Sequence, residues 1–391
     1  MPIGPEPAPA PASRPPADAA FLPATVVPAS DQPGSGPGPQ DAERLPVTLA
    51  ARAAQYAHAS RAASTWRAYD ADLRHFRAWC AAQPGAPAAV PASALTVAGY
   101  LAALADTGYK ASTIRRRLAA ISVAHQLAQV PNPAAAPQVA TVWDGIRRIH
   151  GVRPARKEAL ETSLLTRILA AIDEPPADAG AGGAGSDSSS GATDAGTGSG
   201  ARRSGAATAV ALAAVRDRAL LLVGFAGCLR RSELVGLDVA DIDVTADGLV
   251  LSVRSSKTDQ EGAGALVGLA YGSYRPTCPV RAWQAWVAAA GLRDGPAFRG
   301  INRHGHVGAG RLHASSVALI VQRRTAAAGL DPADFAGHSL RSGFATAAAR
   351  AGVADRAIMR QGRWRSATSL DSYVRAGRLF DRDNPSGHVG L

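Results

Sequence analysis

Six polar residues in the C-terminal half of the chain are of types that could together act on one phosphodiester. They are Arg230, Lys257, His338, Arg341, Trp364 and Tyr373. A guanidinium presents a rigid fork of donors that matches phosphate oxygens, and an imidazole exchanges a proton near neutral pH. A lysine whose pKa is tuned can give up a proton, and a tyrosine hydroxyl can serve as a covalent nucleophile.

The expected local structure places some of these side chains. The segment HSLRSGFATAAARAG is helical in pattern, so His338 and Arg341, three residues apart, should share a face. The alternating segments LVLSVRS and ALVGLA predict a β-hairpin with Lys257 at its tip. Tyr373 falls in a short predicted helix, after a turn built around Gly362. Spacing alone does not bring these groups to one phosphate.

Four segments that contain these residues resemble the conserved boxes of the tyrosine recombinases, the phage integrase family. They read GCLRRSELVGLDVADID, SSKTD, HSLRSGFATAAARAG and GRWRSATSLDSYVR, and they occur in the family's order. Trp364 lies nine residues before Tyr373, as in the family's pattern. The resemblance covers residues 46–376, because the helical region 46–150 is similar to the family's N-terminal SAM-like core-binding domain.

The resemblance implies a role for each of the reacting groups. Tyr373 would attack the scissile phosphate, form a 3'-phosphotyrosine and free a 5'-hydroxyl. Arg230 and Arg341 would bind the non-bridging oxygens as charge grows on them. Lys257 would protonate the leaving 5'-oxygen, and His338 would assist proton transfer from the tyrosine.

The remaining members have supporting roles in the resemblance. The indole N–H of Trp364 can donate to the phosphate but cannot do acid–base chemistry, and Glu233 supports the hydrogen-bond network. Two arginines and a lysine can stabilise the transition state without a divalent metal. The phosphotyrosine bond keeps the energy of the broken bond, and the sequence contains no GxxxxGK[ST] phosphate loop. We therefore expect no cofactor, neither a metal nor ATP.

Other residues of the same types compete for these roles. Arg231 lies beside Arg230, but the box reads G-C-L-R before R-S-E-L, which favours Arg230. Tyr271 and Tyr274 are nucleophiles by type, but neither follows the tryptophan. Three histidines near Cys278 have a spacing that matches no familiar zinc site; they are His304, His306 and His313, and they fall in a Gly-rich loop.

Four amphipathic helices are predicted in the region 46–150, where apolar residues recur at helical spacing. They should form a compact domain with a basic outer surface. Any single arginine there is also typical of a solvated helix face, but the clusters together favour phosphate contacts, which supply affinity without sequence choice. The expected DNA-binding arginines are Arg67, Arg74, Arg115, Arg116, Arg117, Arg147 and Arg148.

Two low-complexity tracts flank or interrupt these regions. Residues 1–45 are rich in Pro and Ala and too poor in large apolar groups to fold, so they are expected to be a disordered arm. A Gly/Ser-rich insertion at about 174–204 interrupts the second domain, which spans 151–391. That domain should otherwise contain helices at 161–172, across AVRDRALLLVGFAGCLRRSELVGL, and from about 279 onward.

Charge and cysteine usage bound the partners and the compartment. The formal net charge is +11, and the excess is carried by both folded regions, which suits a polyanion. The three cysteines are far apart and include no CxxC pair, so we expect a reducing cytosol and no disulfides. No run of about 18 apolar residues exists to span a membrane, and no secretory signal is apparent.

These features predict a mainly α protein with a small β-sheet, an α+β fold. The resemblance implies a C-shaped clamp on double-stranded DNA and a homo-tetramer on two DNA sites, formed from a protein that can be monomeric in solution. We expect a site-specific DNA recombinase of the cytoplasm, associated with the nucleoid. Two alternatives are a type IB topoisomerase-like nicking and resealing enzyme and a catalytically silent DNA-binding clamp. The helical N-terminal domain argues against the first, and the intact set of six argues against the second.

Overall fold

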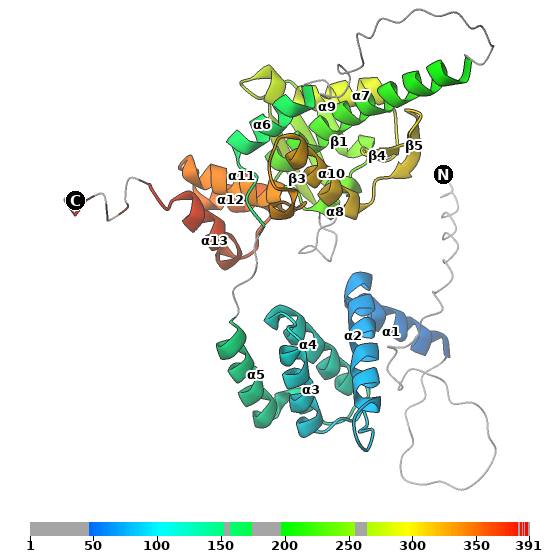
Figure 1. Cartoon of the computed structure of the whole chain (residues 1–391), viewed down its shortest axis with the longest axis vertical. Helices are drawn as coiled ribbons and strands as arrows, with labels where there is room; N and C mark the ends of the chain where they lie inside the picture. The colour runs from blue at the N-terminus through cyan, green and yellow to red at the C-terminus, as the bar shows by residue number, and fades with distance from the viewer. Residues whose placement is uncertain are drawn as a thin grey trace, which may run out of the picture. The chain divides into compact units, whose positions relative to one another are not determined.

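The computed structural model of the chain describes residues 47–151, 157–173, 197–254 and 264–381, with four residues of the C-terminal tail. The chain divides into two compact units, residues 1–155 and 156–391 (Figure 1). The arm expected at 1–45 lies outside the described residues. In the part that is described, no helix is long and apolar enough to cross a membrane.

In the described residues, the N-terminal unit contains five α-helices. They are α1 (Val47–Ala59), α2 (Ala63–Ala81), α3 (Ala94–Asp106), α4 (Ala111–Leu127) and α5 (Pro137–His150). Two sequence signals fix helix starts: the Ser93 side chain accepts from Thr96 N at 3.0 Å, and Pro137 occupies the first turn of α5. The last four helices bury one face each, around Phe76, Tyr100 and Ile121.

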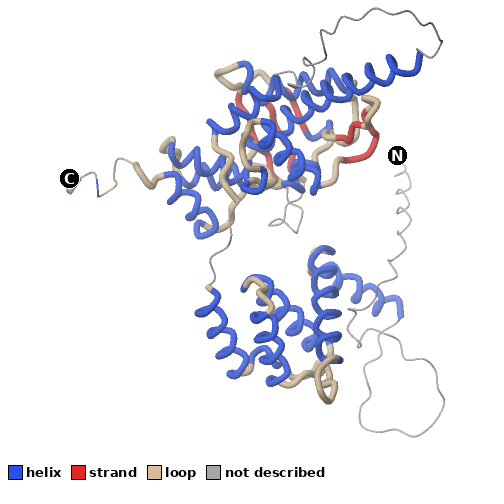
Figure 2. The backbone as a smooth tube through the Cα atoms, in the orientation of Figure 1, coloured by secondary structure: helices blue, strands red, loops and turns tan. Residues whose placement is uncertain are grey.

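The C-terminal unit is a helical body around a small sheet. Its helices are α6 (Thr162–Asp173), α7 (Thr197–Ala226), α8 (Arg231–Gly236), α9 (Pro279–Ala290), α10 (Ala314–Ala327), α11 (Ser339–Arg350), α12 (Asp355–Gly362) and α13 (Ala367–Gly377). Its strands are β1 (Ile242–Val244), β2 (Gly248–Val253), β3 (Ala265–Ala270), β4 (Arg299–Ile301) and β5 (Val307–Arg311). Figure 2 shows every described strand in this unit.

The long helix α7 organises the main core of this unit. Its apolar run 219–223 is fully or almost fully buried, and it packs along α9, as Figure 1 shows. β1, β2 and β3 form an antiparallel sheet in that order, with Leu251 paired to Val267. The predicted β2–β3 hairpin is therefore present, although the segment 255–263 that joins its strands lies outside the described residues.

A second, smaller core holds the last three helices together. α11 packs on α13 and α12 through Ala345, Ala349, Ile358, Leu370 and Val374. Trp364 and Tyr373 pack against this cluster from its edge. The segment that carries the predicted nucleophile is thus folded against the helix that begins next to His338.

Several elements differ from the sequence-based expectation. α1 precedes the four predicted helices and was not expected; its sequence, VTLAARAAQYAHA, is rich in Ala and contains few large apolar residues. The segment expected as one helix across Arg230 breaks at 227–230, where Cys228 takes a left-handed conformation with φ 47°. The loop expected around His304 and His306 contains the β4–β5 hairpin. α7 begins at Thr197, so residues 197–204 at the end of the expected insertion are helical, while 174–196 lies outside the described residues.

Candidate active site

Arg230 lies at the N-terminus of α8, directly after the break between α7 and α8. Its backbone N–H donates to Glu233 Oε2 at 2.9 Å, and its Nη1 donates to Oε1 at 2.5 Å. Glu233 is buried, with 4% of its surface exposed. One buried carboxylate therefore fixes both the main chain and the guanidinium of Arg230. Hydrogen bonds to an ionised group are stronger than those between neutral groups.

Arg341 lies in the first turn of α11, and only 1% of its surface is exposed. Its Nη1 donates to the Cys228 carbonyl at 2.5 Å, and its Nη2 donates to the Gly362 carbonyl. These bonds tie α11 to the α7–α8 turn and to the α12–α13 turn. They use two of the five N–H donors of the guanidinium, and they hold the others in one orientation.

His338 and Tyr373 meet directly. His338 Nε2 and Tyr373 Oη are 2.9 Å apart. His338 is the residue that precedes α11 rather than a member of the helix, so it projects from the same end of α11 as Arg341. A neutral imidazole with its proton on Nδ1 can accept the phenolic proton at Nε2, which is the first step in activating a tyrosine nucleophile.

Trp364 fills the space between Arg341 and Tyr373. The Arg341 guanidinium lies 4.0 Å from the centroid of the indole, and the Tyr373 ring centroid is 6.0 Å away. A Cβ placed on Gly362 would lie 1.8 Å from the indole, so only glycine lets Trp364 lie against the backbone there. The indole therefore makes packing and cation–π contacts that fix its two neighbours.

The charges of the site act on one another. Partial desolvation, followed by the positive charges of Arg341, Arg230 and Arg231, lowers the pKa of His338, which favours its neutral, proton-accepting form. Burial lowers the pKa of Arg341 to about 10, so it remains a cation at neutral pH.

Glu233 balances two opposing influences. Burial alone would raise the pKa of Glu233. The charge of Arg363 and the hydrogen bonds from Arg230 outweigh burial and lower that pKa overall. The carboxylate is therefore ionised at neutral pH, as its two arginine partners require.

Lys257 is the one member of the predicted set that the structure does not place. It lies in the segment 255–263, outside the described residues. The structure brings the other five predicted residues and Glu233 into one continuous set of contacts. One residue in this set escaped sequence reasoning: Arg363, whose Nη2 donates to Glu233 Oε2 at 2.7 Å. Its only signal was a basic residue directly before Trp364.

The seven arginines expected to bind DNA behave differently from one another. Arg117 is buried, with 8% of its surface exposed, and its guanidinium lies 4.2 Å from the Tyr109 ring centroid. Arg117 therefore contributes to the core of the N-terminal unit, and its burial does not favour the predicted DNA contact. Arg116 makes two hydrogen bonds to the buried Asp72, at 2.8 and 2.9 Å. The other five are exposed on the surface: Arg67, Arg74, Arg115, Arg147 and Arg148.

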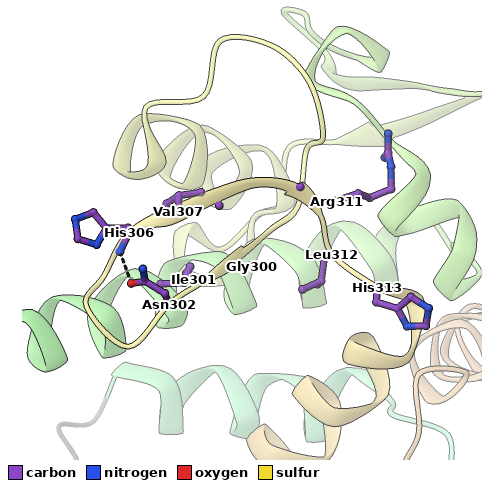
Figure 3. Close-up of a pocket in the computed structure, with 10 residues that line it drawn as sticks. Gly300, Ile301, Asn302, His306, Val307, Arg311, Leu312 and His313 are labelled. Carbon is purple, nitrogen blue, oxygen red and sulfur yellow. Dashed lines mark hydrogen bonds between the residues drawn. The ribbon is translucent and has the colours of Figure 1, made fainter.

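The histidines of the β4–β5 hairpin do not converge. A shallow pocket lies along this hairpin, and Figure 3 shows His306 and His313 at its opposite ends. The His306 backbone N–H donates to Asn302 Oδ1 at 3.0 Å, and the His313 side chain caps α10. Within the described ranges, no three His, Cys, Asp or Glu side chains gather as a metal ligand set.

The arrangement has the parts of a phosphoryl-transfer site. The Tyr373 hydroxyl contacts the His338 imidazole, whose lowered pKa favours the neutral form, and the charges of Arg341 and Arg230 lie close enough to contribute to that lowering. Preorganised cations of this kind stabilise the charge that develops on phosphate oxygens in the transition state.

Comparison with known proteins gives the same assignment for the two units. The model of the phage integrase family matches residues 205–378, and the model of the phage integrase N-terminal SAM-like domain matches residues 56–129. An integrase/recombinase xerD homolog of Selenomonas ruminantium is 34% identical over 339 residues, which cover 86% of this chain and 88% of the relative.

Solved structures share the fold at low identity. XerH recombinase bound to its difH substrate matches with TM-score 0.50 and 15% identity, over 76% of this chain and 72% of that one. A lambda integrase dimer on a core site matches with TM-score 0.50 and 15% identity, over 81% and 73%. The Tn1549 transposon integrase with transposon right end DNA gives the same score and identity, over 84% and 96%. The chain therefore belongs to the phage integrase family of tyrosine recombinases, enzymes that transfer DNA strands.

Proposed function

We propose that this enzyme is a site-specific DNA recombinase that cleaves and rejoins DNA through a 3'-phosphotyrosine on Tyr373, without metal or ATP. The observation that carries the proposal is the 2.9 Å contact between His338 Nε2 and Tyr373 Oη. A phenol is a weak nucleophile until a neighbouring base accepts its proton. In this site the pKa of the neighbouring imidazole is lowered, so the base is neutral when the tyrosine needs it.

The cleavage step balances as a transesterification. The Tyr373 hydroxyl proton passes to His338, the phenolic oxygen bonds to phosphorus, and the bond from phosphorus to the 5'-oxygen breaks. Arg230 and Arg341 stabilise the non-bridging oxygens, and Lys257 supplies the proton to the leaving 5'-oxygen. Trp364 holds Arg341 and Tyr373 in register. Rejoining is the reverse attack by a 5'-hydroxyl, which can come from a second DNA site.

The proposed assembly is a tetramer on two double-stranded DNA sites, with both units of each protomer on the duplex. The solved relative of similar fold from lambda is a dimer bound to a core site, which supports an oligomer on DNA. Exposed arginines of the N-terminal unit supply phosphate contacts. We place the reaction in the cytoplasm, on the DNA of the nucleoid.

A capture experiment tests this proposal and identifies the DNA target at the same time. The protein is incubated with a pool of nicked suicide duplexes of random and native genomic sequence, and covalent protein–DNA adducts are isolated and sequenced. Adducts at one shared sequence are the expected result. Adducts and plasmid relaxation without sequence preference would mean a topoisomerase-like enzyme. Binding to DNA without adducts on any substrate would mean a catalytically silent clamp.

A further inference from the structure

Arg363 has an unusual backbone and an unusual environment for an arginine. It ends α12 in the left-handed conformation, with φ 55°, which is costly for a residue with a side chain. Its side chain is also almost fully buried, with only 9% of its surface exposed. An arginine is expensive to bury unless its donors are satisfied. Neither feature would persist without compensating contacts.

The compensating contacts reach across to another turn. Arg363 Nη2 donates to Glu233 Oε2 at 2.7 Å and to the Cys228 carbonyl at 3.1 Å. Its Nη1 donates to the Gly227 carbonyl at 3.3 Å and, within its own turn, to the Gln361 carbonyl at 2.8 Å. One guanidinium thus binds the turn that precedes Arg230 as well as the carboxylate that holds it.

The two turns that Arg363 joins are both strained. Cys228 has φ 47°, and its carbonyl accepts from Arg341 Nη1 at 2.5 Å as well as from Arg363. Strained backbone of this kind persists where the surroundings over-determine it, and it clusters at functional sites. Here the surroundings are two buried arginines that share one carbonyl oxygen.

We propose that Arg363 is a positioning residue that locks the Trp364 turn onto the Arg230 turn and thereby preassembles the cleavage site. The inference rests on the proposed function, because it assigns the lock a purpose in strand cleavage. Glu233 gives Oε1 to the Arg230 guanidinium and Oε2 to Arg363. Loss of Arg363 would leave a buried carboxylate oxygen short of its charged partner, so Glu233 and the Arg230 guanidinium would shift together.

Two variants separate this role from simple backbone strain. Arg363→Gly removes the side chain and also relieves the strain of the left-handed backbone. If backbone strain alone limited cleavage, this variant would therefore cleave faster than the wild type. Arg363→Lys keeps one positive charge but cannot present the planar fork that serves several acceptors. Arg378→Ala is the matched control, because Arg378 also joins a carboxylate and a carbonyl, Asp355 and Val353, away from Glu233.

The first measurement is single-turnover adduct formation by the full-length protein on captured suicide DNA, set beside its DNA affinity. We expect Arg363→Gly to lower the cleavage rate about 10²-fold, the scale of a small misplacement of catalytic groups, and to leave the Kd for DNA within about twofold. Arg363→Lys should lose about tenfold, and Arg378→Ala should match the wild type. A cleavage rate for Arg363→Gly equal to the wild type, or a loss confined to DNA affinity, would overturn the inference.

The second measurement is hydrogen exchange on the unbound proteins. Arg363→Gly should speed exchange at both turns, residues 227–230 and 361–366, whereas Arg378→Ala should change neither. Faster exchange at 361–366 alone would refute the lock between turns. This result is decisive even if the wild type forms no adduct, so failure of the inference and failure of the proposed function are distinguishable.

Discussion

Two buried carboxylates, one in each unit, are built in the same way and serve different ends. Asp72 in the N-terminal unit and Glu233 in the C-terminal unit are each 4% exposed. Each is met by two arginines: Asp72 by Arg116 and Arg117, and Glu233 by Arg230 and Arg363. Residue type, burial and charge therefore do not distinguish the two clusters.

The other contacts of the arginines make the difference. Arg117 turns to the rings of Tyr109 and Tyr100 in the helical core, so the Asp72 cluster holds helices together. The arginines on Glu233 contact the turns that carry the predicted reacting groups. The role of each buried cluster is thus set by the other groups that its arginines contact. The comparison can be tested by breaking each cluster in turn.

Among the variants that break one of the two clusters, the largest effect is expected for Glu233→Gln. The amide keeps the shape of the carboxylate but turns an N–H₂ toward one of two arginines, so Arg230 loses its orientation. Cleavage at saturating DNA should fall about 10²–10³-fold, the range for one preorganised transition-state donor. Single-turnover adduct formation measures this, and a change of less than about threefold would remove Glu233 from the site.

Asp72→Asn should act on stability instead. Breaking a buried ion pair from one side costs about 3–5 kcal/mol, and the partly exposed Arg116 places this pair at the lower end. Urea unfolding, with proteolysis mapped to residues 47–151, should show the loss in the N-terminal unit. The cleavage rate at saturating DNA should stay close to that of the wild type. A loss of cleavage rate as large as that expected for Glu233→Gln would contradict the claim that the two clusters have different roles.

A smaller, pH-dependent effect is expected for His338. Its pKa lies below the ordinary value of 6.5 because desolvation and neighbouring arginines disfavour the cation. The neutral base is lost only as the pH falls through that lowered pKa, so the acid limb of cleavage should lie below pH 6.5, with about a tenfold loss per pH unit beyond it. His338→Gln should remove the limb, whereas a wild-type midpoint above 6.5 would contradict the assignment.

The smallest effect is expected for Arg115→Ala, which changes a surface arginine close to the buried Arg117. Arg115 is exposed and Arg117 is buried on the same helix. Arg115→Ala should weaken DNA binding a few-fold and reduce the slope of log K against log salt by about 1. Arg117→Met should change the unfolding midpoint and leave the salt slope unaltered. Equal salt slopes for wild type and Arg115→Ala would exclude a phosphate contact there.

The sequence predicted what depends on periodicity and missed what depends on tertiary partners. The apolar spacing of Leu73 and Phe76 revealed a buried helix face, and alternation revealed the β2–β3 hairpin. The burial of Arg117 was hidden, because a run of three arginines looks like a solvated surface until a carboxylate and aromatic rings from other helices meet it.

The same limit applies within the candidate site. The reacting residue types were visible in order, and the side-by-side placement of His338 and Tyr373 required the packing of α11 on α13. The break at Cys228 and the left-handed Arg363 were invisible, because neither residue type signals a positive φ. The hydrogen bonds from Arg363 to the Gly227 and Cys228 carbonyls, which join the two turns, are tertiary contacts that local sequence does not reveal.

The central claim is that Tyr373 is the covalent nucleophile. The most direct measurement digests a trapped wild-type protein–DNA adduct and locates the nucleotide by mass spectrometry, with Tyr373→Phe treated in parallel. We predict a nucleotide on the peptide that contains Tyr373 and no adduct with the variant. A nucleotide on Tyr271 or Tyr274, or an adduct that survives in Tyr373→Phe, would contradict the account.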